Sequence, residues 1–193
     1  MTQSPIKTYA GMGCSATEFY ISDDNVQIIE NNRIIPFSEI SDINIQILNN
    51  EIESDQAVQI ELLKMHPNPE DNFIRLEQFV RCRFGGLDYQ ADIKDGILQQ
   101  GEYWECPKRG NCQSEGILCK LPSYNGKPLE LNEIKLLQLT ATNKTNEVIA
   151  EDLDLPLGSF HKIKKTIYKK LGIQTKQEAV VISFFLNLIQ FNN

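Results

Sequence analysis

Residues 129–180 read LELNEIKLLQLTATNKTNEVIAEDLDLPLGSFHKIKKTIYKKLGIQTKQEAV, and this stretch decides the fold of the C-terminal part of the chain. Apolar residues recur in it at helical spacing, in three groups around Ile134, Ile149 and Ile167. Such spacing buries one face of each helix against its neighbours. The pattern predicts a short helical bundle over residues 129–190.

Residues that start and stop helices stand between these groups. Thr145 precedes the second group as a predicted N-cap, and Gly158-Ser159 is predicted to break and cap the chain before the third. Pro156 falls in the predicted turn, where its missing N–H costs little. Gly172 follows the third group, where a left-handed C-cap residue is expected.

The order of these residues resembles the C-terminal helix-turn-helix of LuxR-type (GerE-like) transcription regulators. Residues at the family's framework positions are Leu129, Glu133, Leu137, Ala141, Asn146, Ile149, Ala150, Glu151, Leu153, Gly158, Ile167, Tyr168, Lys170, Leu171, Gly172 and Glu178-Ala179-Val180. The chain departs from the family at Asn143, where a left-handed residue is expected, and at Phe160 and Ile163 in the third helix. The resemblance implies an all-α four-helix domain that docks its third helix onto DNA.

The third predicted helix is strongly basic, because Ser159–Leu171 holds five lysines and no acid. In the major groove such a helix reaches base edges and neighbouring phosphates. The residues expected to contact double-stranded DNA are Lys144, Thr145, Asn146, Ser159, His161, Lys162, Lys164, Lys165, Thr166, Lys169 and Lys170. In isolation, the same lysines are typical of a solvated helix face.

The charge of the chain is unevenly distributed. Its net charge is −7, but residues 129–193 hold 8 Lys/Arg and 7 Asp/Glu, whereas residues 1–128 hold 11 and 19. We therefore expect DNA affinity to be modest and strongly salt-dependent. No run of apolar residues is long enough to span a bilayer, and the N-terminus lacks the apolar core of a secretory signal. These features predict a cytoplasmic protein without a membrane partner.

Residues 179–189 (AVVISFFLNLI) are apolar almost all round the predicted last helix. One apolar face suffices to cover a small bundle, so the second face predicts another contact. The resemblance implies a homodimer formed by this helix, and burial against the N-terminal part of the chain is the alternative. The residues expected at the contact are Val180, Val181, Phe184, Phe185 and Leu188.

Four of the five cysteines lie close together in the sequence, at Cys82, Cys106, Cys112 and Cys119. An odd number of cysteines in a cytoplasmic chain argues against a disulfide framework and favours metal binding. Four thiolates could hold a structural Zn²⁺, which is the leading interpretation. Their wide spacing also suits an iron–sulfur cluster, and free structural thiols are a third alternative. Cys14 is expected to pack as a small apolar residue.

The remainder of the N-terminal part is predicted to be β-rich. Strands are expected at residues 17–21, 26–29, 33–37, 43–47 and 57–63, because these runs are apolar, β-branched or alternating. Residues 72–84 follow helical spacing up to Gly85-Gly86. The proline-rich and Asn-Gly-containing segment 121–128 is predicted as a linker.

The sequence therefore predicts an α+β chain. A β-rich N-terminal domain with a four-cysteine element (1–120) and a linker (121–128) precede a helix-turn-helix domain (129–193). We expect a sequence-specific DNA-binding transcription regulator with an N-terminal sensing or interaction domain, and RNA polymerase is a candidate partner. The alternative is an adapter that binds another regulator or a polymerase subunit instead of DNA. No phosphate-binding loop, His-Glu metal helix or Ser/His/Asp arrangement occurs, so no enzymatic activity is expected.

Overall fold

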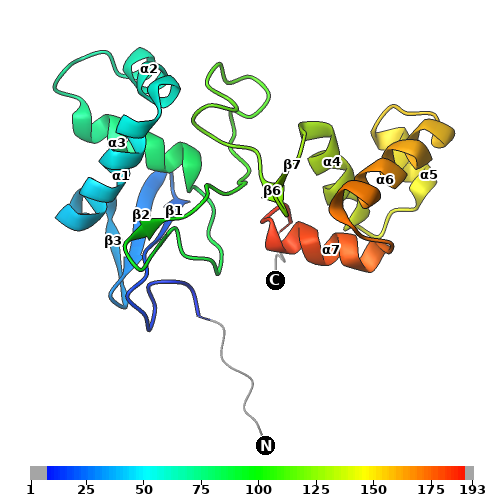
Figure 1. The fold of residues 1–193 in the computed structure, drawn as a ribbon, viewed down its shortest axis with the longest axis horizontal. Coiled ribbons are helices and arrows are strands. Elements are labelled where there is room, and N and C mark those ends of the chain that lie inside the picture. The colour runs from blue at the N-terminus through cyan, green and yellow to red at the C-terminus, as the bar shows by residue number, and fades with distance from the viewer. Residues whose placement is uncertain (1–7, 190–193) are drawn as a thin grey trace, which may run out of the picture. The chain divides into compact units, whose positions relative to one another are not determined.

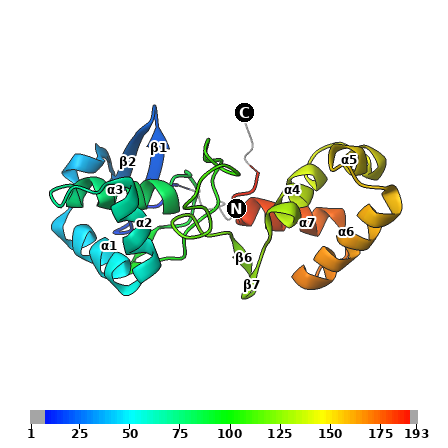
Figure 2. The same ribbon diagram turned by 90° about the horizontal axis from the view of Figure 1, so that it is seen from above.

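A computed structural model describes residues 8–189 of the chain. The chain forms two compact units, Met1–Lys120 and Leu121–Asn193. Each unit has its own buried side chains. Figures 1 and 2 show the helices and strands of each unit. The architecture is mixed α+β, with helices in both units and small antiparallel sheets.

A three-stranded antiparallel meander forms the sheet of the first unit. Its strands are β1 (Glu18–Ser22), β2 (Asn25–Glu30) and β3 (Arg33–Pro36), with β2 in the centre. Two-residue loops join them, Asp23-Asp24 and Asn31-Asn32, and all four residues have positive φ. Such turns match the twist of paired strands, and Asn and Asp tolerate the left-handed conformation. These three strands were expected from the sequence.

Two helices stand where strands were predicted. Residues 43–47 belong to α1 (Asp42–Ser54), and residues 57–63 belong to α2 (Gln56–Met65). The N-terminal part is therefore not β-rich, and both strand predictions were wrong. The third helix, α3 (Asn72–Arg83), follows the helical spacing of its sequence.

The local sequence explains why both segments are helical. In α1 the inward residues are Leu48, Ile45 and Ile52, which are spaced three and four apart, whereas Ile43 is 69% exposed. In α2 the carboxylate of Asp55 accepts hydrogen bonds from two backbone N–H groups of the first turn. That N-cap satisfies donors that the helix itself leaves without a partner.

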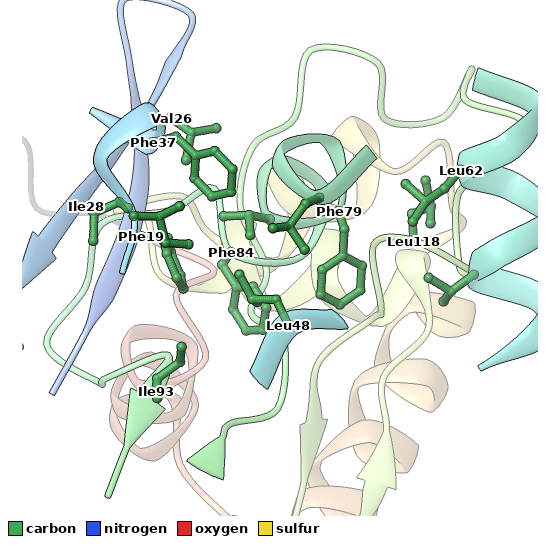
Figure 3. Close-up of a cluster of buried hydrophobic side chains, with 14 residues drawn as sticks. Phe19, Val26, Ile28, Phe37, Leu48, Leu62, Phe79, Phe84, Ile93 and Leu118 are labelled. Atoms are coloured by element: carbon green, nitrogen blue, oxygen red, sulfur yellow. The ribbon is translucent and has the colours of Figure 1, made fainter. Parts of the chain in front are cut away.

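The core of the first unit lies between the sheet and the helices (Figure 3). Phe19 of β1 is within ring-contact distance of Phe37 and Phe84, and Phe79 of α3 packs edge-on to Phe84. Leu118, from the cysteine-bearing segment, is also buried in this core. A short hairpin, β4 (Ile93–Lys94) and β5 (Ile97–Leu98), and a 3-10 turn η1 (Phe37–Glu39) complete the unit.

The second unit begins with a small hairpin and continues with four helices within the described residues. The hairpin, β6 (Ser123–Tyr124) and β7 (Lys127–Pro128), turns at Asn125-Gly126 within the segment expected as a linker. The helices are α4 (Leu131–Thr140), α5 (Asn146–Asp152), α6 (Leu157–Leu171) and α7 (Lys176–Phe185). Helix α4 packs against α7 and α5, and α5 packs against α6 (Figure 2).

Three of these helices end in the same way, with a residue in the left-handed conformation after the last turn. Gly172 has this role after α6, as predicted, and Asp154 and Asn187 have it after α5 and α7. Each is followed by an N–H that bonds back to a carbonyl five residues earlier. Helix α7 consequently ends at Phe185, earlier than the predicted end at residue 190.

Candidate nucleic-acid interface and cysteine cavity

Helices α5 and α6 are joined by the four residues 153–156, a length typical of helix-turn-helix motifs. The hydroxyl of Thr145 accepts a hydrogen bond from the Val148 N–H, so Thr145 is the N-cap of α5, as predicted. The left-handed residue in the turn is Asp154, and the N–H of Leu155 bonds to the carbonyl oxygen of Ala150 at 2.9 Å. Helix α6 begins at Leu157 with Pro156 as its N-cap, so Gly158-Ser159 lies inside the helix and does not cap it.

Helix α6 has a buried stripe and an opposite outer face. Phe160, Ile167 and Leu171 are buried in the second unit. The exposed residues on the remainder of the helix are Leu157, Gly158, Ser159, His161, Lys162, Ile163, Lys165, Thr166 and Lys169. Spacing by three and four residues aligns the set Lys162, Lys165, Thr166 and Lys169, which we call the outer face of α6.

Two of the five lysines of α6 are held inside the second unit. Lys164 Nζ donates a hydrogen bond of 2.9 Å to Oδ1 of Asn146, and it lies 5.3 Å from the ring centre of Tyr168. Burial lowers the pKa of Lys164. Lys170 Nζ lies 2.5 Å from Oε2 of Glu133 in α4. These contacts make both lysines part of the framework of the unit.

The other residues expected at DNA have local roles as well. Lys144, which precedes α5, forms an ion pair of 2.7 Å with Asp152, the last residue of α5. This ion pair therefore links the two ends of the helix. Thr145 caps α5, and Asn146 accepts the hydrogen bond from Lys164. The Thr166 hydroxyl donates to the carbonyl oxygen of Lys162. The predicted contact residues that are exposed along α6 are Ser159, His161, Lys162, Lys165, Thr166 and Lys169.

The two departures from the family pattern in α6 have different positions. Phe160 is fully buried, and so it belongs to the core of the unit. Ile163 is 37% exposed and lies beside the outer face. Asn143 was expected to be left-handed, but its φ is not positive. The left-handed residue is Asp154, in the turn between α5 and α6.

The five residues predicted at a dimer contact, in α7 and just after it, differ in how exposed they are. Val181 and Phe185 are 53% and 59% exposed, whereas Leu188 is buried within the second unit. Val180 and Phe184 are half-buried. An exposed pair of large apolar side chains one turn apart therefore remains on this helix.

The four clustered cysteines line a single cavity of about 650 Å³ in the first unit. Cys82 comes from α3, and Cys106, Cys112 and Cys119 come from the segment between β5 and β6. Burial raises the pKa of the Cys82 thiol to about 11, and the charges of the other three thiols add to this effect. Cys14 does not share this environment: it is exposed, which differs from the apolar packing expected of it.

Polar and aromatic groups surround the thiols. Gln78 Nε2 donates a hydrogen bond of 3.1 Å to Cys82 Sγ. The indole of Trp104 lines the cavity and donates to the carbonyl oxygen of Cys82 at 3.3 Å. Three cationic side chains and two carboxylates also line the cavity: Arg81, Lys108, Arg109, Asp24 and Glu115.

A buried group of carboxylates, absent from the sequence-based expectations, lies in the same unit. Oxygens of Glu18, Asp88 and Glu102 lie within 4.8 Å of one another. Burial raises the pKa of Glu18 to about 9 and that of Glu102 to about 10, and it raises the pKa of Asp88 as well. Asp92 is fully buried beside them, and its pKa is raised well above the ordinary value. Glu18 and Glu102 therefore hold their protons at neutral pH.

No helix in the described part of the chain combines the length and apolar character needed to cross a membrane. Comparisons with protein-family models, with curated proteins and with solved structures each found no match to this chain.

Proposed function

We propose that the chain is a transcription regulator that binds double-stranded DNA through the outer face of α6. One observation carries the proposal: α6 exposes Lys162, Lys165 and Lys169 on one side and contains no acidic residue. Phosphates attract such a face, and an exposed helix of this length fits the major groove.

The internal contacts of the second unit support this proposal. Lys164 and Lys170 bond to α5 and α4, so α6 is held at both its middle and its C-terminal end. A rigidly held helix loses little conformational entropy when it docks, which favours binding. The four-residue turn before α6 and the resemblance of residues 129–180 to LuxR-type domains agree with this role.

The exposed apolar pair on α7 supports a dimer of such regulators. Val181 and Phe185 are large, apolar and exposed, and water contact with such surface is unfavourable. A two-fold dimer would present two copies of α6 to two half-sites, whose spacing follows from the dimer geometry.

Selection of bound fragments from genomic DNA tests the proposal. The full-length protein is incubated with sheared genomic DNA at moderate salt, and the retained fragments are sequenced. We expect enrichment of a paired half-site motif with the wild-type protein and loss of enrichment with K162E/K165E/K169E.

The matched control is R33E/K94E/K135E, which makes the same change in net charge at three exposed residues outside α6. It should retain the enriched motif. Equal enrichment by wild type and the α6 variant, or none by the wild type, would contradict DNA binding through α6. Absence of enrichment with the wild type would favour the alternative, an adapter that binds another regulator or a polymerase subunit.

A further inference from the structure

We propose that the cysteine cavity of the first unit binds an iron–sulfur cluster through Cys82, Cys106, Cys112 and Cys119. The proposal concerns a second site, and it does not depend on DNA binding by α6.

Four thiols from distant positions in the sequence converge on one cavity. Cys82 lies in the last turn of α3, and the other three cysteines lie 24 to 37 positions later in the chain, yet all four line the same cavity. Cys106 and Cys112 each begin a tight turn, since their carbonyl oxygens accept from the N–H groups of Arg109 and Glu115. The fold thus places several cysteines on loops around one space, as cluster-binding segments do.

The cysteine-bearing segment is anchored to α3 beside the cavity. Leu118 is buried in the core next to Cys119, and the guanidinium of Arg83 donates a 2.8 Å hydrogen bond to the carbonyl oxygen of Leu118. Gly85 and Trp104 also fit closely, because a Cβ at Gly85 would lie 2.5 Å from the indole. The positions of Cys82 and Cys119 are therefore fixed by packing that does not involve the thiols.

The spacing of the four sulfurs differs from that around a single zinc ion. A zinc ion bound by four thiolates at about 2.3 Å holds them about 3.8 Å apart, by tetrahedral geometry. In the described residues no three of these sulfurs lie within 4.8 Å of one another, although three carboxylates do. A cluster keeps its four thiolates farther apart, since several metal and sulfide atoms stand between them. The separation and the size of the cavity favour a cluster over a single ion.

Charged side chains and a hydrogen-bond donor surround the thiols. On the cavity wall Arg81 pairs with Asp24 and Arg109 pairs with Glu115. Lys108 adds one positive charge to these two pairs, and this excess suits a group with net negative charge. The Gln78 amide already donates to Cys82 Sγ, and hydrogen bonds to sulfur tune cluster potentials. Cluster binding would displace the thiol protons, because the ligand form of cysteine is the thiolate.

Metal and sulfide analysis of the full-length wild-type protein tests the proposal. The protein is isolated without oxygen, incubated with equal amounts of ferrous and ferric iron and with sulfide, and separated from unbound ions; two ferrous ions, two ferric ions and four sulfides then balance a four-iron cluster as the four thiols release their protons. We expect a brown protein that contains iron and acid-labile sulfide in equal amounts. A colourless protein with one zinc per chain and no sulfide would overturn the proposal, and so would a protein that takes up neither metal.

Serine variants assign the ligands. C82S, C106S, C112S and C119S should each lose most of the bound iron and sulfide, whereas C14S, which alters the exposed cysteine outside the cavity, should retain both. Equal loss in C14S, or full retention in all four cavity variants, would overturn the assignment. Circular dichroism checks that each variant is folded. If a variant does not fold, the iron and sulfide content of the wild-type protein decides whether the cavity binds a cluster.

DNA binding measured on the same samples separates the two proposals. A protein that binds DNA but no cluster contradicts only the cavity assignment. A protein that binds the cluster but no DNA contradicts only the proposed function.

Discussion

Lys164 Nζ donates a hydrogen bond of 2.9 Å to Oδ1 of Asn146, and this bond joins the middle of α6 to the first residue of α5. The five lysines of α6 therefore have two different roles, although the sequence alone does not distinguish them. Lys164 and Lys170 stabilise the unit, whereas Lys162, Lys165 and Lys169 are exposed.

Removing one outer-face lysine should weaken binding to all DNA sequences alike. K162A, K165A and K169A should each reduce the slope of log affinity against log salt by about one, since each removes about one phosphate contact. Fluorescence anisotropy over a range of salt concentrations measures this slope. K135A, at an exposed lysine of α4, should leave the slope unchanged, and a slope that changes equally in the control would contradict the assignment.

Replacing Lys170 with Met should destabilise the second unit. Glu133 would lose its ammonium partner while its side chain stays 14% exposed, and losing a charged hydrogen bond of this kind costs about 1–3 kcal/mol. Trp104, the single tryptophan, lies in the first unit. We therefore expect the far-ultraviolet circular dichroism transition to shift to lower denaturant while the tryptophan fluorescence transition stays in place. Equal shifts in both signals would mean that Lys170 does not act within the second unit.

Ile163 should contribute to base preference. It lies exposed beside the outer face of α6, and an apolar side chain there can contact the thymine methyl group in the major groove. I163A should reduce the preference for thymine at one position in each half-site, with little change in affinity for unrelated DNA. Sequencing of selected fragments measures both quantities. An unchanged motif would place Ile163 away from the bases.

The buried carboxylates should make the first unit less stable as pH rises. Glu18 and Glu102 have folded-state pKa values of about 9 and 10, above the ordinary value of 4.5, because burial disfavours their charged forms. The folded state therefore holds protons that the unfolded state releases. Their contribution to stability is fully present below about pH 4.5 and is lost as pH rises through 9 to 10.

The E18Q variant tests this dependence. The amide keeps an acceptor for the Asp88 N–H and cannot ionise, so E18Q should lose less stability than the wild type between pH 5 and pH 9. Denaturant unfolding followed by Trp104 fluorescence measures the difference, and E39Q, at an exposed residue, is the matched control. Parallel pH profiles for E18Q and the wild type would show that Glu18 is already ionised in the fold.

The sequence predicted the elements whose signals are local. Gly172 ends α6 and Thr145 caps α5, as expected, because a single residue determines each feature. The same structural role at Asp154 and Asn187 was missed, since Asp and Asn adopt positive φ only where the surrounding chain requires it. The strand prediction for residues 43–47 failed because Ile43, Ile45 and Ile47 alternate, while burial of Leu48 selects the helical period.

The cysteines and the carboxylates of the first unit also differ in whether the sequence reveals them as a group. Four cysteines within 38 positions are visible in the sequence as a group, and they line one cavity in the structure. Glu18, Asp88 and Glu102 carry no local motif, and only the tertiary fold brings them together. The acid at the first position of β1, Glu18, was the one available signal, since charged residues are rarely buried.

The most direct test of DNA binding through α6 is the salt dependence of binding to the selected motif. Anisotropy titrations compare the wild type, K162E/K165E/K169E and the charge-matched R33E/K94E/K135E. We predict that the wild type and R33E/K94E/K135E bind with steep, similar salt slopes, and that the α6 variant shows no saturable binding at moderate salt. Binding by the α6 variant with the wild-type affinity and slope would contradict the proposed function.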